Sequence, residues 1–188
     1  LTLNQEGDAC YLRGACYMAQ GDYDKAKTDF DAAVALSPKD NDLVLDIYGC
    51  YQEQIRSADG APYLENALNI EDSSDEGSYQ KARIYFYLED YDNAQSLLNP
   101  LVEKKNGEAM ALMAKIYLEE GDTTHARNLW QELISSAGES QTAYNGLVLC
   151  DIQDGDYASA LGNVDKGLAL SGEEAQQELM YNAIVACV

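Results

Sequence analysis

The feature that most constrains this chain is an internal repeat with a period close to 34 residues. One column of the repeat holds Tyr17, Tyr51, Tyr85 and Tyr117, and Asp151 continues it. A second column holds small residues, at Ala26, Gly60, Ala94, Ala126 and Ala160, and a third holds mostly bulky residues, at Phe30, Leu64, Leu98, Trp130 and Val164. A unit of this length cannot bury its apolar face alone, so the period predicts several units stacked on a shared core.

The first unit shows why each repeat predicts a pair of helices. Residues 8–20 carry apolar groups at helical spacing and contain no proline, so they predict a first helix. Gly21 ends this helix, because glycine readily adopts the left-handed conformation that stops a helix. Residues 24–36 predict a second helix, which Pro38 prevents from continuing. We expect Phe30, on the apolar face of the second helix, to fill the space between neighbouring hairpins.

The pattern of this unit resembles the tetratricopeptide repeat family. The residues at the family's spacing are Gly14, Tyr17, Gly21, Tyr23, Ala26, Phe30, Ala33 and Pro38. The resemblance implies an all-α fold, a right-handed superhelix (α-solenoid) of stacked antiparallel helical hairpins. It covers nearly the whole chain, residues 1–188, as one array of five units, at about 7–40, 41–74, 75–106, 107–140 and 141–174. The remaining residues, 175–188, are then an extra capping helix or the first helix of a truncated sixth unit.

Two prolines fall inside predicted second helices. Pro62 lies early in the second helix of the second unit, so we expect that helix to begin late, after an irregular connection over residues 56–61. Pro100 lies inside the second helix of the third unit, where the missing backbone donor predicts a kink or a break.

The chain is strongly acidic, with 33 Asp and Glu residues against 12 Lys and Arg residues and a net charge of -21 at pH 7. Such a surface repels polyanions, which argues against nucleic acid and anionic lipid as partners. The acidity is consistent with a basic partner or simply with solubility, and both readings stay open. No apolar stretch is long enough to span a membrane, so we expect no direct membrane insertion by this segment.

The cysteines are predicted to be packing residues. One repeat position holds Cys16, Cys50 and Cys150 in three units and Ile84, Ile116 and Ile184 in the others. A position that alternates cysteine with isoleucine predicts buried free thiols, and no CxxC spacing suggests zinc. Free thiols favour a cytoplasmic location. The alternative is a membrane-anchored cell-envelope lipoprotein from which a segment before Leu1 has been removed.

Little in the sequence suggests catalysis. His125 is the one histidine, so a nucleophile assisted by histidine has a single candidate base. The motifs of nucleophile elbows, P-loops, dinucleotide sites and zinc proteases are missing from the sequence. We therefore expect no enzymatic activity, no cofactor and no bound metal.

The resemblance implies that the first helix of each hairpin lines a concave groove. The groove residues predicted on this basis are Tyr11, Met18, Gln52, Tyr79, Arg83, Phe86, Tyr87, Lys115 and Asn145. Arg83 and Lys115 take the same position in adjacent units, so they predict a basic spot with aromatic side chains around it. Such a spot suits an acidic side chain or the terminal carboxylate of a peptide.

The same two cations have a simpler explanation, in which each pairs with a nearby acid. Candidate acids of this kind are Glu76, Glu108 and Glu119. The leading hypothesis is nevertheless a non-enzymatic scaffold that binds a protein or peptide. The alternatives are a structural module that forms homo-oligomers through its apolar C-terminal helix, and a regulatory arm of a larger bacterial envelope lipoprotein.

Overall fold

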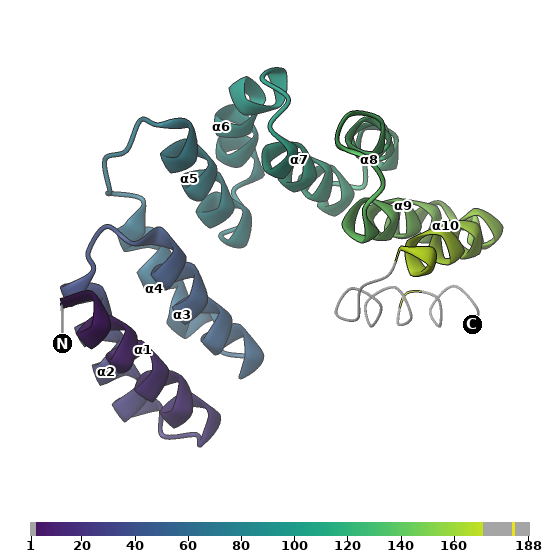
Figure 1. Ribbon diagram of the computed structural model, residues 1–188. Helices are drawn as coiled ribbons and strands as arrows, with labels where there is room; N and C mark the ends of the chain where they lie inside the picture. The colour runs from purple at the N-terminus through teal and green to yellow at the C-terminus, as the bar shows by residue number, and fades with distance from the viewer. Residues whose placement is uncertain (1–2, 171–181, 183–188) are drawn as a thin grey trace. The chain divides into compact units, whose positions relative to one another are not determined.

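The computed structural model describes residues 3–170 and Asn182. The chain divides into two units, Leu1–Ala94 and Gln95–Val188, and each is described by itself. Every regular element within the described residues is an α-helix (Figure 1). The prediction of an all-α fold is therefore confirmed.

The first unit contains two complete helical hairpins and a third that begins in it. Its helices are α1 (Leu3–Ala19), α2 (Tyr23–Leu36), α3 (Asn41–Glu53), α4 (Ser57–Ala67), α5 (Asp75–Tyr87) and the start of α6 (Tyr91–Glu103). Helix α1 packs against α2 and α3 against α4, with the helices of each pair running in opposite directions (Figure 1). Helix α3 also contacts α1 and α5, so successive hairpins stack through their first helices.

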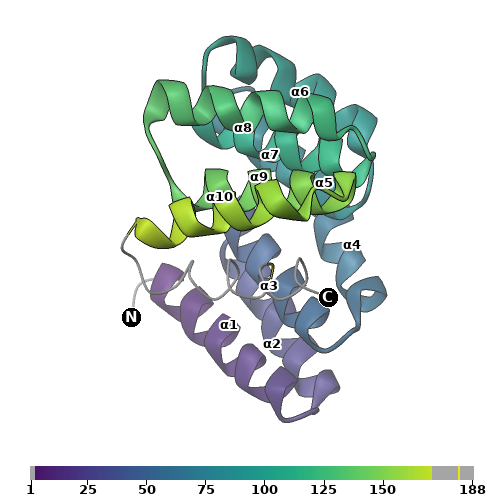
Figure 2. The same cartoon turned by 90° about the vertical axis from the view of Figure 1, so that its right-hand side faces the viewer.

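The second unit repeats this arrangement. It holds the rest of α6 together with α7 (Gly107–Glu119), α8 (Thr123–Ala137), α9 (Gln141–Asp154) and α10 (Tyr157–Ala169). Helix α7 pairs with α8 and α9 with α10, and α9 contacts both α7 and α8 (Figure 2). The predicted packing of adjacent hairpins is thus present in both units.

The turns inside the hairpins share one hydrogen bond. The carbonyl of each residue in the tyrosine column accepts from the amide five residues later, at 2.7–2.9 Å, in the pairs 17–22, 51–56, 85–90, 117–122 and 151–156. Asp151 keeps this backbone role although its side chain differs. The residue before each donor is left-handed, with φ of 78° at Gly21, 57° at Ile55, 59° at Glu89, 80° at Gly121 and 75° at Gly155. The turn geometry is therefore common to all five hairpins, even where glycine is absent.

In each unit, a member of the third column of the repeat packs against the next hairpin. All five members of this column, from Phe30 to Val164, are at most 4% exposed. The Phe30 ring lies 5.9 Å from the ring of Tyr51 on the next hairpin. The indole of Trp130 covers Gly146 on α9 so closely that an added Cβ would lie 2.2 Å from it. The expectation that Phe30 fills the space between hairpins is confirmed.

Helix α4 corrects the prediction made from Pro62. The helix begins at Ser57 and runs through the proline, so the expected late start and irregular connection over residues 56–61 are wrong. Gly60 explains the early start, because it packs so tightly on Tyr51 that a Cβ would lie 2.9 Å from that side chain. Packing against α3 stabilises the first turn of α4, which precedes Pro62 and does not need the backbone amide that proline lacks.

Helix α6 similarly continues through Pro100, so the predicted break is wrong. Leu98 is 0% exposed and Leu101 is 2% exposed, one on each side of the proline. Burial of both leucines offsets the loss of one backbone hydrogen bond near the helix end.

The cysteines follow the prediction only in part. The four described cysteines are free thiols, of which Cys150 is buried, Cys10 and Cys50 are half-buried, and Cys16 is exposed. The shared repeat position faces the preceding hairpin, as the 3.9 Å contact between the Tyr11 hydroxyl and Cys50 shows. No described hairpin precedes α1, so Cys16 has no such cover. The prediction for residues 175–188 lies outside the described residues, apart from Asn182.

Candidate functional site

Four of the predicted groove residues lie together on α5. Tyr79, Arg83, Phe86 and Tyr87 are spaced i, i+4, i+7 and i+8, which places them on one side of the helix. The helix is started by Ser74, whose hydroxyl accepts from the Gly77 amide at 2.9 Å. We call this set of four side chains the α5 face.

The aromatic end of the α5 face is held against α3. The rings of Phe86 and Tyr87 meet edge to face at 5.5 Å, and the Tyr87 ring lies 5.5 Å from that of Tyr48. The Tyr48 hydroxyl also donates to the Tyr87 carbonyl at 3.4 Å. Because Tyr48 is buried and Tyr87 is 37% exposed, a fixed support presents one ring to solvent.

The cationic end of the α5 face is already paired. Nη1 of Arg83 donates to Asp42 Oδ1 at 2.7 Å and to Gln80 Oε1 at 2.8 Å. Its guanidinium also lies 5.9 Å from the centre of the Tyr79 ring. Pairing of Arg83 with an acid was the simpler reading of the sequence, but the acid is Asp42 rather than Glu76. The positive charge of this spot is therefore partly neutralised.

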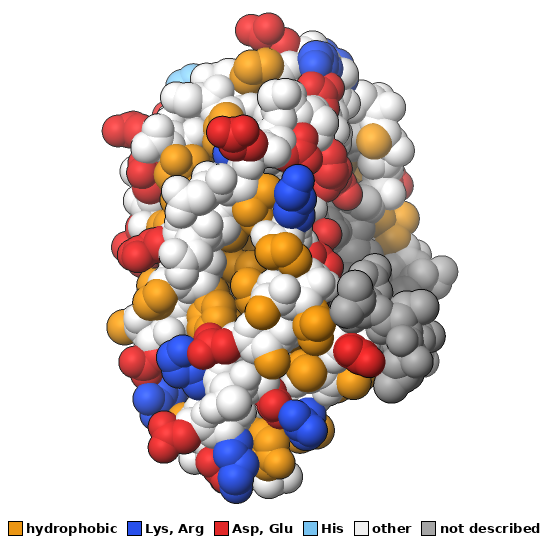
Figure 3. Space-filling view, turned by 90° about the vertical axis from the view of Figure 1, so that its left-hand side faces the viewer, with side chains coloured by type: hydrophobic (Ala, Val, Ile, Leu, Met, Phe, Trp, Pro, Cys, Tyr) orange, Lys and Arg blue, Asp and Glu red, His pale blue; other side chains and the backbone are white. Residues whose placement is uncertain are grey.

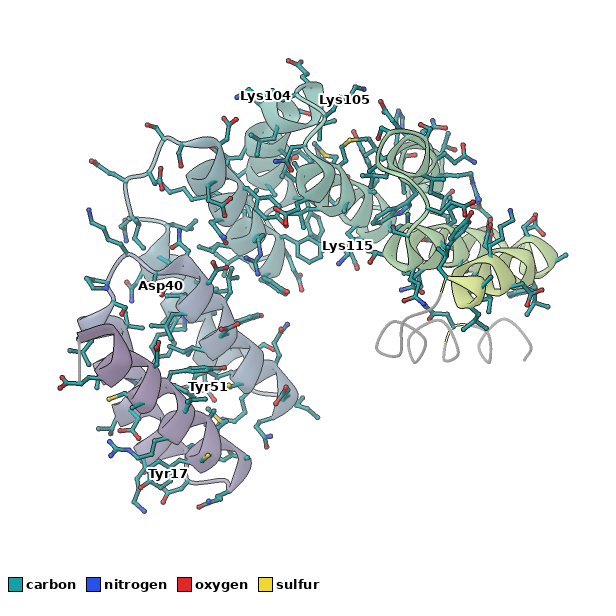
Figure 4. All side chains as sticks on the ribbon, viewed as in Figure 1. Tyr17, Asp40, Tyr51, Lys104, Lys105 and Lys115 are labelled. Carbon is teal, nitrogen blue, oxygen red and sulfur yellow. The ribbon has the colours of Figure 1, made fainter. Side chains whose placement is uncertain are left out.

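Two predicted groove residues belong to the second unit. Lys115 lies on α7, is exposed, and forms no salt bridge with another described residue (Figure 4). Its adjacency to Arg83 stays a prediction. Asn145 on α9 is half-buried, and its Oδ1 accepts from Nδ2 of Asn182 at 2.6 Å. Asn182 therefore contacts a predicted groove residue.

The remaining predicted residues lie on α1 and α3. Met18 is 2% exposed and packs in the core with Phe30, so little of its side chain is available to a ligand. Tyr11 is half-buried, and burial raises its pKa to about 12. Gln52 is exposed on α3. The surface of α1 is thus less available than spacing alone suggested.

The acidic side chains are spread over the visible face rather than gathered in one patch (Figure 3). In the part of the chain that the structure describes, His, Cys, Asp and Glu side chains form no group of three or more suited to a metal ion. No described helix has the length and apolar character that crossing a membrane requires.

Two pockets were not foreseen from the sequence. One, of about 760 Å³, lies in the second unit between α8, α9 and α10. Its wall contains Asp151, which is 1% exposed, is paired with Arg127, and accepts from Asn163 Nδ2 at 2.7 Å. The other, of about 570 Å³, lies in the first unit at the N-terminal ends of α3 and α5. Asp151, the aspartate in the tyrosine column, was the one sequence signal for the pocket of the second unit.

Sequence models of the tetratricopeptide repeat match residues 7–40, 76–101 and 111–175. The comparison with curated protein sequences gave no match.

Three solved structures illustrate the similarity of fold. A tetratricopeptide repeat protein from Parabacteroides merdae has 12% identity and a TM-score of 0.67, with 95% of this chain and 70% of that chain covered. Yeast Tom70 has 18% identity and a TM-score of 0.60, with 97% and 40% covered. The pilF protein of Pseudomonas aeruginosa has 12% identity and a TM-score of 0.56, with 100% and 90% covered. At these identities the similarity shows the fold alone.

Proposed function

Because the chain belongs to the tetratricopeptide repeat family, we propose that it is a non-enzymatic scaffold that binds a protein or peptide partner. This fold is typical of protein–protein interaction scaffolds. We place the contact on the α5 face of the first unit, and Lys115 on α7 of the second unit is a separate proposed contact. The observation that carries this choice is that Tyr79, Arg83 and Tyr87 lie on one side of α5 and offer a cation and an exposed ring. Contacts with α3 hold Arg83 and Tyr87 in place.

The guanidinium of Arg83 can bind a ligand while it keeps its ion pair with Asp42. Both of its hydrogen bonds to Asp42 and Gln80 use Nη1, and Arg83 is 30% exposed. Its Nε and Nη2 can therefore donate in parallel to a second carboxylate, which is the strongest geometry for such a pair. The pairing with Asp42 holds the side chain in place, so less conformational freedom is lost on binding.

The aromatic side of the face gives the partner an apolar contact. Tyr87 combines an exposed edge with a backbone held by Tyr48, and rigid aromatic side chains are frequent anchors in interfaces. A partner segment with an acidic residue next to an apolar residue would meet both ends of the α5 face.

The test uses peptides selected from a random display library on the immobilised full chain. We expect the selected peptides to be acidic. We expect Arg83→Ala and Lys115→Ala each to lower the affinity for these peptides by roughly tenfold, as for loss of one charge-assisted hydrogen bond. The matched control is Arg56→Ala, because Arg56 also pairs with an aspartate and lies 3.9 Å from a tyrosine ring, but at the turn between α3 and α4. Circular dichroism establishes that each variant is folded. Equal losses in all three variants would refute the assignment to the α5 face.

Self-association is a second candidate function, because residues 183–188 form a continuous apolar run, Ala-Ile-Val-Ala-Cys-Val. Light scattering on the full chain and on residues 1–172 distinguishes this possibility. An oligomer that becomes a monomer in the shorter chain supports it, and a monomer in both excludes it. The regulatory arm of an envelope lipoprotein remains an alternative to these two.

A further inference from the structure

The pocket of about 760 Å³ in the second unit is a trough between two second helices. Helix α8 forms one wall and α10 the other, while α9 packs against both and forms the floor (Figure 1). Its lining includes Gln131 and Ile134 of α8, Leu147 of α9, and Gly162, Asn163 and Lys166 of α10. The α5 face and Lys115 both lie on first helices, so the trough is a different surface.

The first unit contains a smaller pocket at the same positions of the repeat. It has a volume of about 240 Å³ and lies between α2 and α4, with Val44 of α3 at its base. Five of its lining residues have counterparts in the larger pocket three repeats later, in the pairs Asp31 and Gln131, Val34 and Ile134, Val44 and Tyr144, Tyr63 and Asn163, and Asn66 and Lys166. The trough between second helices therefore recurs in both units, so it belongs to the repeat.

Two residues of α10 explain why the second trough is the larger one. In the first unit, the Tyr63 hydroxyl reaches the opposite wall and donates to Asp31 at 2.7 Å. Asn163 takes that place in the second unit, is shorter, and turns to the floor, where its Nδ2 donates to Asp151 at 2.7 Å. Its neighbour Gly162 has no side chain, and nothing lies within 4 Å of a Cβ built there. The second trough is thus open where a side chain bridges the first.

The walls of the open trough are held together by buried polar contacts. Asp151 is 1% exposed, is paired with Arg127 of α8 and accepts from Asn163 of α10, so it links all three helices. Nη2 of Arg127 also pairs with Asp154 at 2.7 Å. A ligand that enters a site with fixed walls loses less free energy to reorganisation of the protein.

The acids at the start of α10 are already engaged. Asp154 pairs with Arg127 and accepts from the Thr123 hydroxyl at 2.7 Å. Asp156 caps α10, and it accepts from the Ser159 amide at 3.1 Å and from the Ser159 hydroxyl at 2.7 Å. These carboxylates are therefore poor sites for a further cation.

The unused polar groups lie further along the trough. Lys166 is exposed and makes no ion pair with another described residue, and its Nζ lies 5.9 Å from the centre of the Tyr144 ring. Gln131 and the Oδ1 atom of Asn163 make no hydrogen bond with a described residue. The charge that the trough offers to a ligand is therefore positive and lies at Lys166, with amide groups on both walls.

An apolar surface adjoins this cation. Tyr144, which Lys166 approaches, packs in one apolar cluster with Ile134 and Leu147, and all three line the trough. The lining extends along α10 from Asp156 to Lys166, which is about 15 Å of helix. That length matches about four or five residues of extended chain.

We propose that this trough binds an extended segment of a partner protein, with an apolar side chain against Ile134 and Leu147 and an acidic side chain paired with Lys166. Side chains two residues apart point the same way in an extended segment, so both can enter the trough together. Gln131 and Asn163 hydrogen-bond the backbone of the segment, since an amide side chain can both donate and accept. The site is independent of the α5 face, which belongs to the first unit.

Binding is measured by nuclear magnetic resonance on the isotope-labelled full chain. The probe is the capped heptapeptide Ser-Gly-Leu-Gly-Glu-Gly-Ser, which places Leu and Glu two residues apart. We expect it to shift the backbone signal of Gly162 and the side-chain amide signals of Gln131 and Asn163, with a saturating dependence on concentration. Peptides with Ala in place of Leu, or with Gln in place of Glu, should each have a Kd roughly tenfold higher.

Two variants of the chain, each with a matched control, complete the test. Gly162→Phe fills the trough and should abolish the saturable shifts, with circular dichroism establishing that the variant is folded. Gly49→Phe is its control, because Gly49 is also helical and also has nothing within 4 Å of a built Cβ, but lies in α3 of the first unit. Lys166→Gln, a change at an exposed position, should raise the Kd by roughly tenfold, and Lys39→Gln in the first unit should leave it unchanged.

Equal Kd values for Gly162→Phe and Gly49→Phe, or for Lys166→Gln and Lys39→Gln, would overturn the proposal. The absence of a saturable shift at Gly162 in the unchanged chain would overturn it as well. Shifts confined to residues 79–87 and lost in Arg83→Ala would also overturn it, and they would support the α5 face alone.

Discussion

Gly146 has no room for a side chain, because the Trp130 indole of α8 covers it. An alanine methyl at this position would lie 2.2–2.5 Å from three atoms of the indole, where ordinary carbon contacts are about 3.5–4.0 Å. Trp130 is 1% exposed, so the ring has no empty space into which it can move. Gly146→Ala must therefore push α9 away from α8. Gly162 on α10 is a matched control, because nothing lies within 4 Å of a Cβ built there.

The expected change in stability follows from two opposing effects. Overpacking a buried position costs about 1–3 kcal/mol, and replacing a helical glycine by alanine returns about 1 kcal/mol, so Gly146→Ala should lose up to about 2 kcal/mol. Gly162→Ala has only the gain from replacing a helical glycine and should be stabilised by about 1 kcal/mol. For a chain of this length the difference of about 1–3 kcal/mol between the variants corresponds to about 2–12 °C in Tm.

Thermal and urea unfolding measure this difference directly. Circular dichroism reports the loss of helix, and fluorescence reports α8 in particular, because Trp130 is the one tryptophan of the chain. The emission of Gly146→Ala should also shift to longer wavelength as the indole becomes exposed. If Gly146→Ala were as stable as Gly162→Ala, with unchanged emission, the close stacking of α8 on α9 would be refuted.

Three further predictions concern the buried pairs and the turns. Asp151→Ala should cost about 1–3 kcal/mol, because it removes the buried acceptor of Asn163 and Arg127 while Arg127 keeps its ion pair with Asp154, and urea unfolding measures this loss. Asp29→Asn should reduce the loss of stability on acidification. Arg13 holds the pKa of Asp29 below its ordinary value of about 4 in the folded chain. The ion pair therefore contributes its full stabilisation above pH 4, and this stabilisation disappears as the pH falls through the lower pKa of the folded state. This is measured as the Tm of the variant and of the wild type between neutral and acidic pH. Ile55→Gly should raise stability by about 1 kcal/mol, because Ile55 is 95% exposed and has a left-handed φ of 57°, and a lower Tm would contradict the strain argument.

Column spacing predicted the backbone of the repeat well because the same contacts recur in each unit. Trp130 and Phe30 are buried where the third column placed them, and Asp151 keeps the turn hydrogen bond of the tyrosine column. Pro62 misled the prediction because helix α4 is held by the contact of Gly60 with Tyr51, and the place of Gly60 in the small-residue column was given less weight than the proline.

The exposure of the predicted groove residues does not follow from column spacing, because it depends on what covers each position. Met18 and Gln52 share one repeat position, yet Met18 is buried and Gln52 is exposed. Cys16 and Cys150 also share a position, and only Cys150 has a hairpin packed over it. The ion pair of Arg83 could not be read from the repeat pattern either, since its partner Asp42 lies on a different helix.

Hydrogen–deuterium exchange of the full chain, with and without a display-selected peptide, tests the central claim most directly. The claim is that the first helices of the hairpins, and α5 in particular, form the surface that binds a partner. We expect the peptide to slow exchange over residues 79–87 of α5 and around Lys115 of α7, with little change in α2 and α4. Slower exchange confined to second helices, with α5 and α7 unchanged, would contradict the account.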